Sequence, residues 1–146
     1  MKEKKITFYL MENQTVGKTE DGAHFLFLNG EWEADQNCHS AAGITEISAD
    51  TAAKICGEQL FEFLTAKWKN GFQKERAEWL NSYRWPAKLV STSYRYEGYS
   101  YDIKPEDLGL SDDPYDQGFM ESIQFDLEED LRRYGATHII SGGLMD

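Results

Sequence analysis

The sequence lacks every short motif that would assign it a known chemistry. It contains no phosphate-binding Walker loop, no dinucleotide-binding glycine fingerprint, no HExxH zinc motif and no GxSxG nucleophile motif. Its cysteines do not form the CxxC pairs that bind zinc or exchange disulfides. We therefore predict no catalytic residue, no metal ligand and no cofactor, and we favour a protein that is not an enzyme.

Cysteine itself is scarce, which excludes a disulfide-stapled scaffold. Of the two cysteines, Cys56 falls on the apolar side of a predicted helix, where a buried thiol is favoured over a disulfide. Cys38 and His39 are neighbours in a polar loop, whereas a catalytic Cys–His pair is normally assembled from distant segments. His24 and His138 leave such a pair open, but no signature supports it.

Long apolar runs are also absent. No stretch approaches the roughly 20 apolar residues of a membrane-spanning helix. The apolar stretch after the charged N-terminus ends at Met11, too early for a signal peptide. We therefore expect a cytoplasmic protein with no membrane contact. With 40% hydrophobic residues and only three prolines, the 146-residue chain is predicted to fold as one globular domain, residues 1–146.

Two β-hairpins are predicted from turn chemistry. The first turns at Asn29-Gly30, a dipeptide that favours a two-residue turn. Its register places four side chains on the core side: Phe25, Phe27, Trp32 and Ala34. The second covers residues 88–103 and turns at Glu97-Gly98. Its register places four tyrosines on one face: Tyr94, Tyr96, Tyr99 and Tyr101.

Apolar residues at helical spacing predict three longer helices. The first starts after the N-cap Ser48 and ends at Asn70-Gly71, and a shorter one covers about residues 72–83. The third is capped by Asp113 and extends to Tyr134.

With edge strands at residues 6–11 and 136–140, the predicted order is β-ββ-αα-ββ-α-β. This order indicates an α+β fold: a single small domain with a mainly antiparallel sheet, packed by about three helices. A split βαβ, ferredoxin-like sandwich variant is one compatible layout.

Positive charge is scarce and unevenly placed. Fifteen basic and 26 acidic residues give a net charge of −11. Residues 102–130 hold eleven acids and one lysine, a net charge of −10, whereas residues 67–95 hold seven basic residues and two acids, a net charge of +5. Such local charge informs on partners and surfaces rather than on the fold. Mutual neutralisation of the two segments within the fold is an alternative that we keep open.

The acids of residues 102–130 fall into two groups. Five lie on the solvent side of the third helix and need no function: Glu121, Asp126, Glu128, Glu129 and Asp130. The connection 102–116 holds six more, of which four suit helix starts: Glu106, Asp107, Asp113 and Asp116. A calcium site is not favoured, because the twelfth position counted from Asp113 is Gln124 rather than the glutamate of an EF-hand.

We predict that the connection 102–116, beside the tyrosine-lined hairpin, binds a protein partner with a basic surface. The predicted partner-binding residues are Tyr99, Tyr101, Asp102, Glu106, Asp107 and Asp112. Acidic side chains would steer association and the aromatic rings would anchor the complex. Inhibitors and immunity-type factors of nucleic-acid-acting proteins share this size and charge, by analogy only.

Other interpretations stay open. One is a small enzyme or ligand-binding module with a site between the hairpins and the helices. Another is self-association, with the +5 and −10 segments meeting between copies. The tyrosine face either packs against a helix, which we favour, or forms a stacking platform for a ring-bearing ligand. Direct nucleic-acid binding is disfavoured by the net charge of −11.

Overall fold

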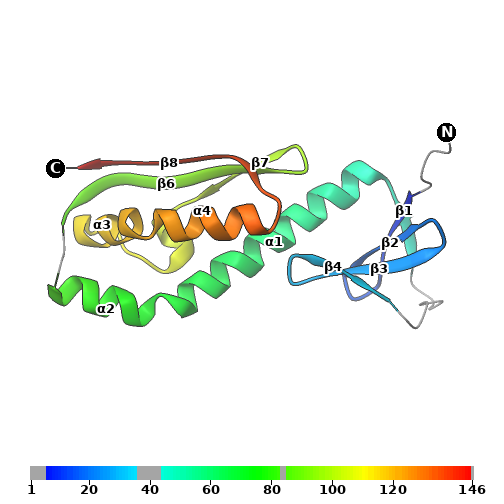
Figure 1. Cartoon of the computed structure of the whole chain (residues 1–146), viewed down its shortest axis with the longest axis horizontal. Helices are drawn as coiled ribbons and strands as arrows, with labels where there is room; N and C mark the ends of the chain where they lie inside the picture. Colours follow the sequence, from blue (N-terminus) through cyan, green and yellow to red (C-terminus); the bar gives the residue numbers. More distant parts are fainter. Residues whose placement is uncertain (1–5, 36–43, 83–84, 146) are drawn as a thin grey trace. The chain divides into compact units, whose positions relative to one another are not determined.

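The structure is a computed structural model that describes residues 6–35, 44–82 and 85–145 (Figure 1). Within these ranges it contains four α-helices, one 3-10 helix and eight strands, which form two antiparallel sheets. The predicted α+β class is confirmed. The chain groups into two compact units, Met1–Leu60 and Phe61–Asp146, and the prediction of one domain stays a prediction.

The first unit is built on a five-stranded sheet with the order β4-β3-β2-β1-β5. Its strands are β1 (Ile6–Leu10), β2 (Val16–Glu20), β3 (Ala23–Leu28), β4 (Glu31–Ala34) and β5 (Thr45–Ile47). Strands β2 and β5 were not predicted, because they are short and rich in polar residues. Their pairing with β1 on its two sides defines them as strands.

The first predicted hairpin has the register that its turn dictates. Phe27 pairs with Trp32 and Phe25 with Ala34. Asn29 and Gly30 have φ angles of 51° and 82°, the left-handed geometry that a two-residue hairpin turn requires. Phe27 is buried and meets the Trp32 ring at 5.1 Å between centroids.

Helix α1 (Ala49–Gly71) begins and ends where the sequence predicts. The backbone N–H of Thr51 donates to Ser48 Oγ at 3.1 Å, so Ser48 is the cap. Cys56 lies on the buried side of the helix and is 3% exposed, which confirms the expected buried thiol.

The second unit consists of the end of α1 and seven further elements. These are α2 (Gln73–Ser82), β6 (Ala87–Tyr96), β7 (Tyr99–Ile103), the 3-10 helix η1 (Pro105–Leu108), α3 (Pro114–Ser122), α4 (Gln124–Arg133) and β8 (Thr137–Met145). The strands form a sheet with the order β7-β6-β8. Helices α3 and α4 run along this sheet, and α2 packs on α3 (Figure 1).

The second predicted hairpin is also confirmed. Tyr96 pairs with Tyr99, Tyr94 with Tyr101 and Thr92 with Ile103. The core of this unit lies under the tyrosine side of β6 and along the apolar stripe of α3 and α4. Its largest fully buried side chains include Tyr94, Ile103, Met120, Leu127 and Leu131.

Three details differ from the sequence prediction. The third helix is interrupted at Ile123, whose N–H bonds to both Phe119 O and Met120 O, so the last turn of α3 tightens before α4 begins. Strand β8 continues through Met145, because its backbone pairs with β6 as far as Ala87. The split βαβ layout does not describe these sheets, because the strands before α1 pair in the five-stranded sheet.

Candidate functional site

A surface groove of about 800 Å³ lies beside the first half of β6. Three segments line it: the start of β6 (Ala87, Lys88, Val90, Ser91), the residues that lead into and begin η1 (Lys104, Pro105, Glu106) and the residues that lead into and begin α3 (Asp112, Pro114, Gln117). Two of the six residues predicted to bind a partner, Glu106 and Asp112, therefore meet at one groove.

The groove exists because β7 is shorter than β6. Strand β6 has ten residues, but β7 has five and pairs only with residues 92–96. After Ile103 the chain enters η1 at Pro105, which has no N–H and cannot continue the ladder. In the part of the chain that the structure describes, no strand covers residues 87–91 of β6 on the side of β7.

Glu106 and Asp112 are both exposed. They belong to the lining of a groove that also has apolar members, among them Val90, Pro105 and Pro114. Two lysines, Lys88 and Lys104, line the same groove. Its charge is therefore mixed, because two carboxylates and two ammonium groups line it together with apolar side chains.

Asp102 and Asp107 have local partners instead of lining the groove. Asp102 is exposed, and its Oδ1 accepts a hydrogen bond from Ser93 Oγ at 2.6 Å across the β6–β7 ladder. Asp107 Oδ2 accepts from the Lys104 N–H at 2.8 Å and so caps η1. Their predicted part in partner binding stays a prediction.

Tyr99 and Tyr101 are half-buried on β7. The Tyr101 ring stacks on Phe61 of α1 and on Tyr94, with centroid distances of 6.1 Å and 5.3 Å. Tyr94 and Tyr96 are buried. The tyrosine face thus packs on a helix at Tyr101, and partner binding by Tyr99 and Tyr101 stays a prediction.

The hydroxyl of Tyr94 is buried and has no hydrogen-bond partner among the described residues. Burial, and then the neighbouring Tyr101 and Tyr96, raise the pKa of Tyr94 well above its usual value.

We expect Tyr94→Phe to raise the free energy of unfolding by about 1 kcal/mol in urea denaturation, because an unsatisfied polar group is removed. The control Tyr134→Phe, at a half-buried position, should change it by less than about 0.5 kcal/mol. A destabilised Tyr94→Phe variant would contradict the assignment.

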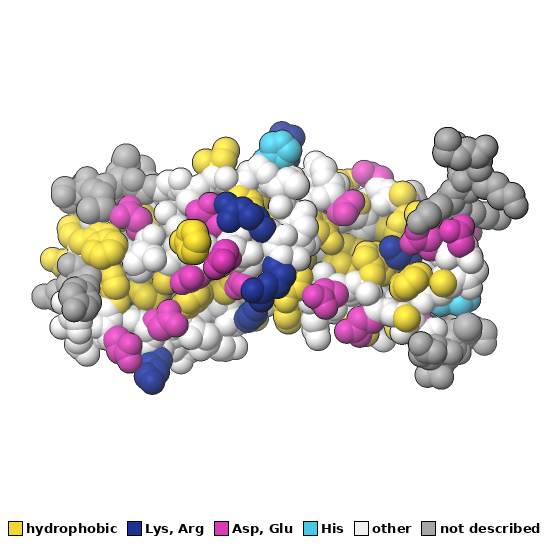
Figure 2. Space-filling model, viewed as in Figure 1, with side chains coloured by type: hydrophobic (Ala, Val, Ile, Leu, Met, Phe, Trp, Pro, Cys, Tyr) yellow, Lys and Arg dark blue, Asp and Glu magenta, His cyan; other side chains and the backbone are white. Residues whose placement is uncertain are grey.

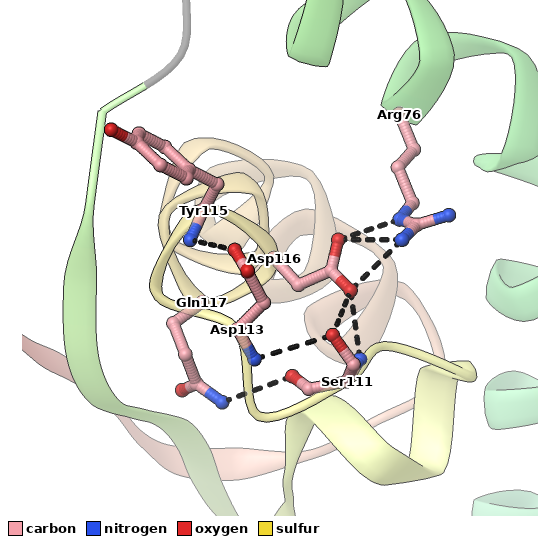
Figure 3. A network of polar contacts seen from close by, with 6 residues as sticks. All are labelled: Arg76, Ser111, Asp113, Tyr115, Asp116 and Gln117. Carbon is pink, nitrogen blue, oxygen red and sulfur yellow. Dashed lines mark hydrogen bonds and ion pairs between the residues drawn. The ribbon is translucent and has the colours of Figure 1, made fainter.

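Asp116 is the one acid of the connection that is buried, with 2% of its surface exposed. Arg76 of α2 donates to it through Nε at 2.8 Å and Nη2 at 2.9 Å, and Ser111 donates through its N–H at 2.8 Å and its Oγ at 2.6 Å (Figure 3). Burial favours the neutral carboxyl, but these bonds outweigh it and lower the pKa of Asp116 below its usual value. The network joins α2, the connection and α3.

Two acids assigned to the solvent side of the third helix accept hydrogen bonds from tryptophan side chains, and a third, Glu128, accepts from Ser141 Oγ at 3.1 Å. Glu121 Oε1 accepts from Trp85 Nε1 at 3.1 Å, and Asp130 Oδ2 accepts from Trp68 Nε1 at 2.9 Å. Lys67 Nζ lies 3.8 Å from the same Asp130 oxygen. Part of the basic segment therefore neutralises acids within the fold, as one alternative anticipated. On the face drawn in Figure 2, acidic side chains are interspersed with lysine and arginine and form no continuous block.

A second, smaller cavity of about 250 Å³ lies between the end of α1, α2, residues 108–110 and α3. Trp68, Phe72 and Phe119 line it together with Lys69 and Arg76. Its volume is below the range of about 300–1,000 Å³ that is typical of small-molecule sites. A ligand-binding role between hairpins and helices stays a prediction.

Two further observations concern the described residues alone. They include no group of three or more histidine, cysteine or acidic side chains that could hold a metal ion. None of their helices is both long and apolar enough to cross a membrane. Cys38 and His39 lie outside the described residues, so their predicted loop is not tested.

The groove beside β6 thus offers apolar contact, exposed carboxylates and an uncovered strand edge at one place. An uncovered strand edge beside apolar surface is a feature by which proteins bind an extended segment of another chain. Searches against protein-family models, curated proteins and solved structures found no match.

Proposed function

We propose that this chain is a non-enzymatic binding protein that captures a protein partner with a basic surface in the groove beside β6. One observation carries the proposal: the exposed carboxylates of Glu106 and Asp112 line an open groove that also presents apolar surface. Apolar contact supplies the binding free energy, at about 25 cal/mol per Å² buried before entropic costs. The carboxylates supply steering and orientation.

The mixed charge of the groove sets the chemistry of the partner. Lysine or arginine must reach Glu106 and Asp112, and positive charge must avoid Lys88 and Lys104. Proteins that act on nucleic acid carry basic surfaces of this kind. Inhibition of such a protein by occupying its basic surface is the role that we propose.

Charge reversal at the groove tests this function. We expect the double variant Glu106→Lys/Asp112→Lys to lose partner capture from a lysate of the native cells at low salt by about tenfold or more. In the wild type, captured protein should elute along a salt gradient, because interactions between exposed charges are screened. The purified partner should also associate more slowly with the groove variant.

The matched control is Asp126→Lys/Glu129→Lys, which changes the net charge equally at two exposed positions of α4. It should retain capture within about threefold of the wild type. Thermal unfolding of both variants verifies that they are folded. Equal loss in the two variants, or capture that is independent of salt, would rule out the groove as the site.

A further inference from the structure

We propose that the partner enters this groove as an extended segment that pairs with residues 87–91 of β6 and adds a strand to the three-stranded sheet. The inference rests on the proposed function and specifies its binding mode. The added strand would lie in line with β7, on the part of β6 that β7 leaves uncovered.

The alternation of the β6 backbone places the N–H of Val90 on that edge. Tyr96 and Tyr99 flank the two-residue turn, so they form a hydrogen-bonded pair. Every second residue of β6 then faces β7, which gives Tyr94, Thr92 and next Val90. The register of β6 against β8 shifts between Lys88 and Ser91, and the bond of the Val90 N–H to Gln117 Oε1 agrees with its placement on the β7 edge. Thr92 pairs with Ile103, the last residue of β7, and Val90 lies beyond that end.

The side chain of Gln117 accepts the hydrogen bond that a paired strand would accept from β6. The N–H of Val90 donates to Gln117 Oε1 of α3 at 3.3 Å, longer than the usual 2.9–3.0 Å of such bonds. The Gln117 amide oxygen thus sits where a strand carbonyl would accept. Gln117 Nε2 is held only weakly, at 3.5 Å from Ser111 O (Figure 3). A strand carbonyl can replace this oxygen without leaving the Val90 N–H unsatisfied.

The dimensions and charges of the groove define the occupant. At about 3.3 Å per residue, the uncovered edge has room for a segment of four or five residues, and the register shift of β6 between Lys88 and Ser91 lies within it. Side chains of a strand alternate between its two faces. A segment with lysine or arginine at alternate positions can therefore meet Glu106 and Asp112, while apolar residues between them contact the apolar lining.

The probe for the test is the pentapeptide Lys-Val-Lys-Val-Lys, acetylated and amidated at its ends, titrated into the full chain and followed by amide NMR. We expect the largest shifts at residues 87–91 and at Gln117. The counterpart peptide with glutamate in place of lysine should bind at least about tenfold more weakly. Two further peptides carry N-methyl groups on either the lysines or the valines.

Only one of these two methylation patterns blocks the amides that face β6. One methylated peptide should therefore lose about tenfold or more in affinity while the other stays within about twofold. Gln117→Ala should bind the unmethylated peptide about twofold to tenfold more tightly, because no side chain has to be displaced. The matched control Gln124→Ala should not, because Gln124 Nε2 bonds to Ser91 O and Gly142 O at the β8 side of β6.

Equal effects of the two methylation patterns, shifts located away from residues 87–91, or no binding of the lysine peptide would each overturn strand addition. Partner capture that still depends on Glu106 and Asp112 would then leave the proposed function standing. Loss of that dependence would overturn both.

Discussion

Gly118→Ala is expected to destabilise the protein by about 3 kcal/mol or more. Gly118 is buried within α3, and a Cβ added there would overlap the backbone carbonyl oxygen of Trp85 and come within 2.9 Å of the Trp79 ring. Alanine favours the helical backbone by about 1 kcal/mol relative to glycine, but the backbone of Trp85 cannot move aside as a flexible side chain would. Urea unfolding of the two proteins measures the difference.

Gly71→Ala is the matched control for this prediction. Gly71 ends α1, and an added Cβ would have no neighbour within 4 Å among the described residues. That variant should be neutral or more stable by up to about 1 kcal/mol. A Gly118→Ala variant as stable as Gly71→Ala would show that α3 does not pack directly on the backbone of Trp85, just before β6.

The second large effect is expected at Asp116. Asp116→Ala should lower the free energy of unfolding by about 2–3 kcal/mol, because it leaves the donors of Arg76 and Ser111 without their acceptor. The Arg76 side chain is 40% exposed, so water can replace part of the hydrogen bonding that Arg76 loses in the variant. Asp112→Ala, at an exposed residue of the same connection, should change stability by less than about 0.5 kcal/mol.

The contribution of Asp116 should also depend on pH in a definite direction. Its pKa is lower in the folded protein than the usual 3.8, so the unfolded chain takes up the proton first as the pH falls. The stability difference between wild type and Asp116→Ala should be fully present above about pH 5 and shrink as the pH falls below about 4. A difference that is constant from about pH 3 to pH 7 would contradict an ionised, hydrogen-bonded Asp116.

Short-range chemistry made much of the fold predictable. The turns at Asn29-Gly30 and Glu97-Gly98 determine which residues face each other, and both registers are found as expected. The caps Ser48 and Asp113 mark helix starts because each side chain accepts from a backbone N–H two or three residues later. Strand β2 was not predicted, because its five residues, Val16–Glu20, are defined as a strand by their pairing with β1 on one side and β3 on the other.

The buried acid was missed, although the sequence carries a signal for it. Asp116 precedes Met120 by four residues and Ile123 by seven, so it stands on the apolar stripe of the third helix. A carboxylate on that stripe predicts burial with a cationic partner. The sequence does not predict which cation pairs with Asp116, because Arg76 is 40 residues away in sequence and is one of seven basic residues in its segment.

The candidate site was likewise predictable from the sequence only in part. From the sequence came the acids of the connection 102–116 and the hairpin beside them, because charge and turn chemistry are local properties. Only the tertiary structure decided that Asp102, Asp107 and Asp116 have partners of their own, whereas Glu106 and Asp112 line a groove at an uncovered strand edge. Ion pairing and edge coverage depend on which distant segments pack together, and no rule that acts over a few residues contains that information.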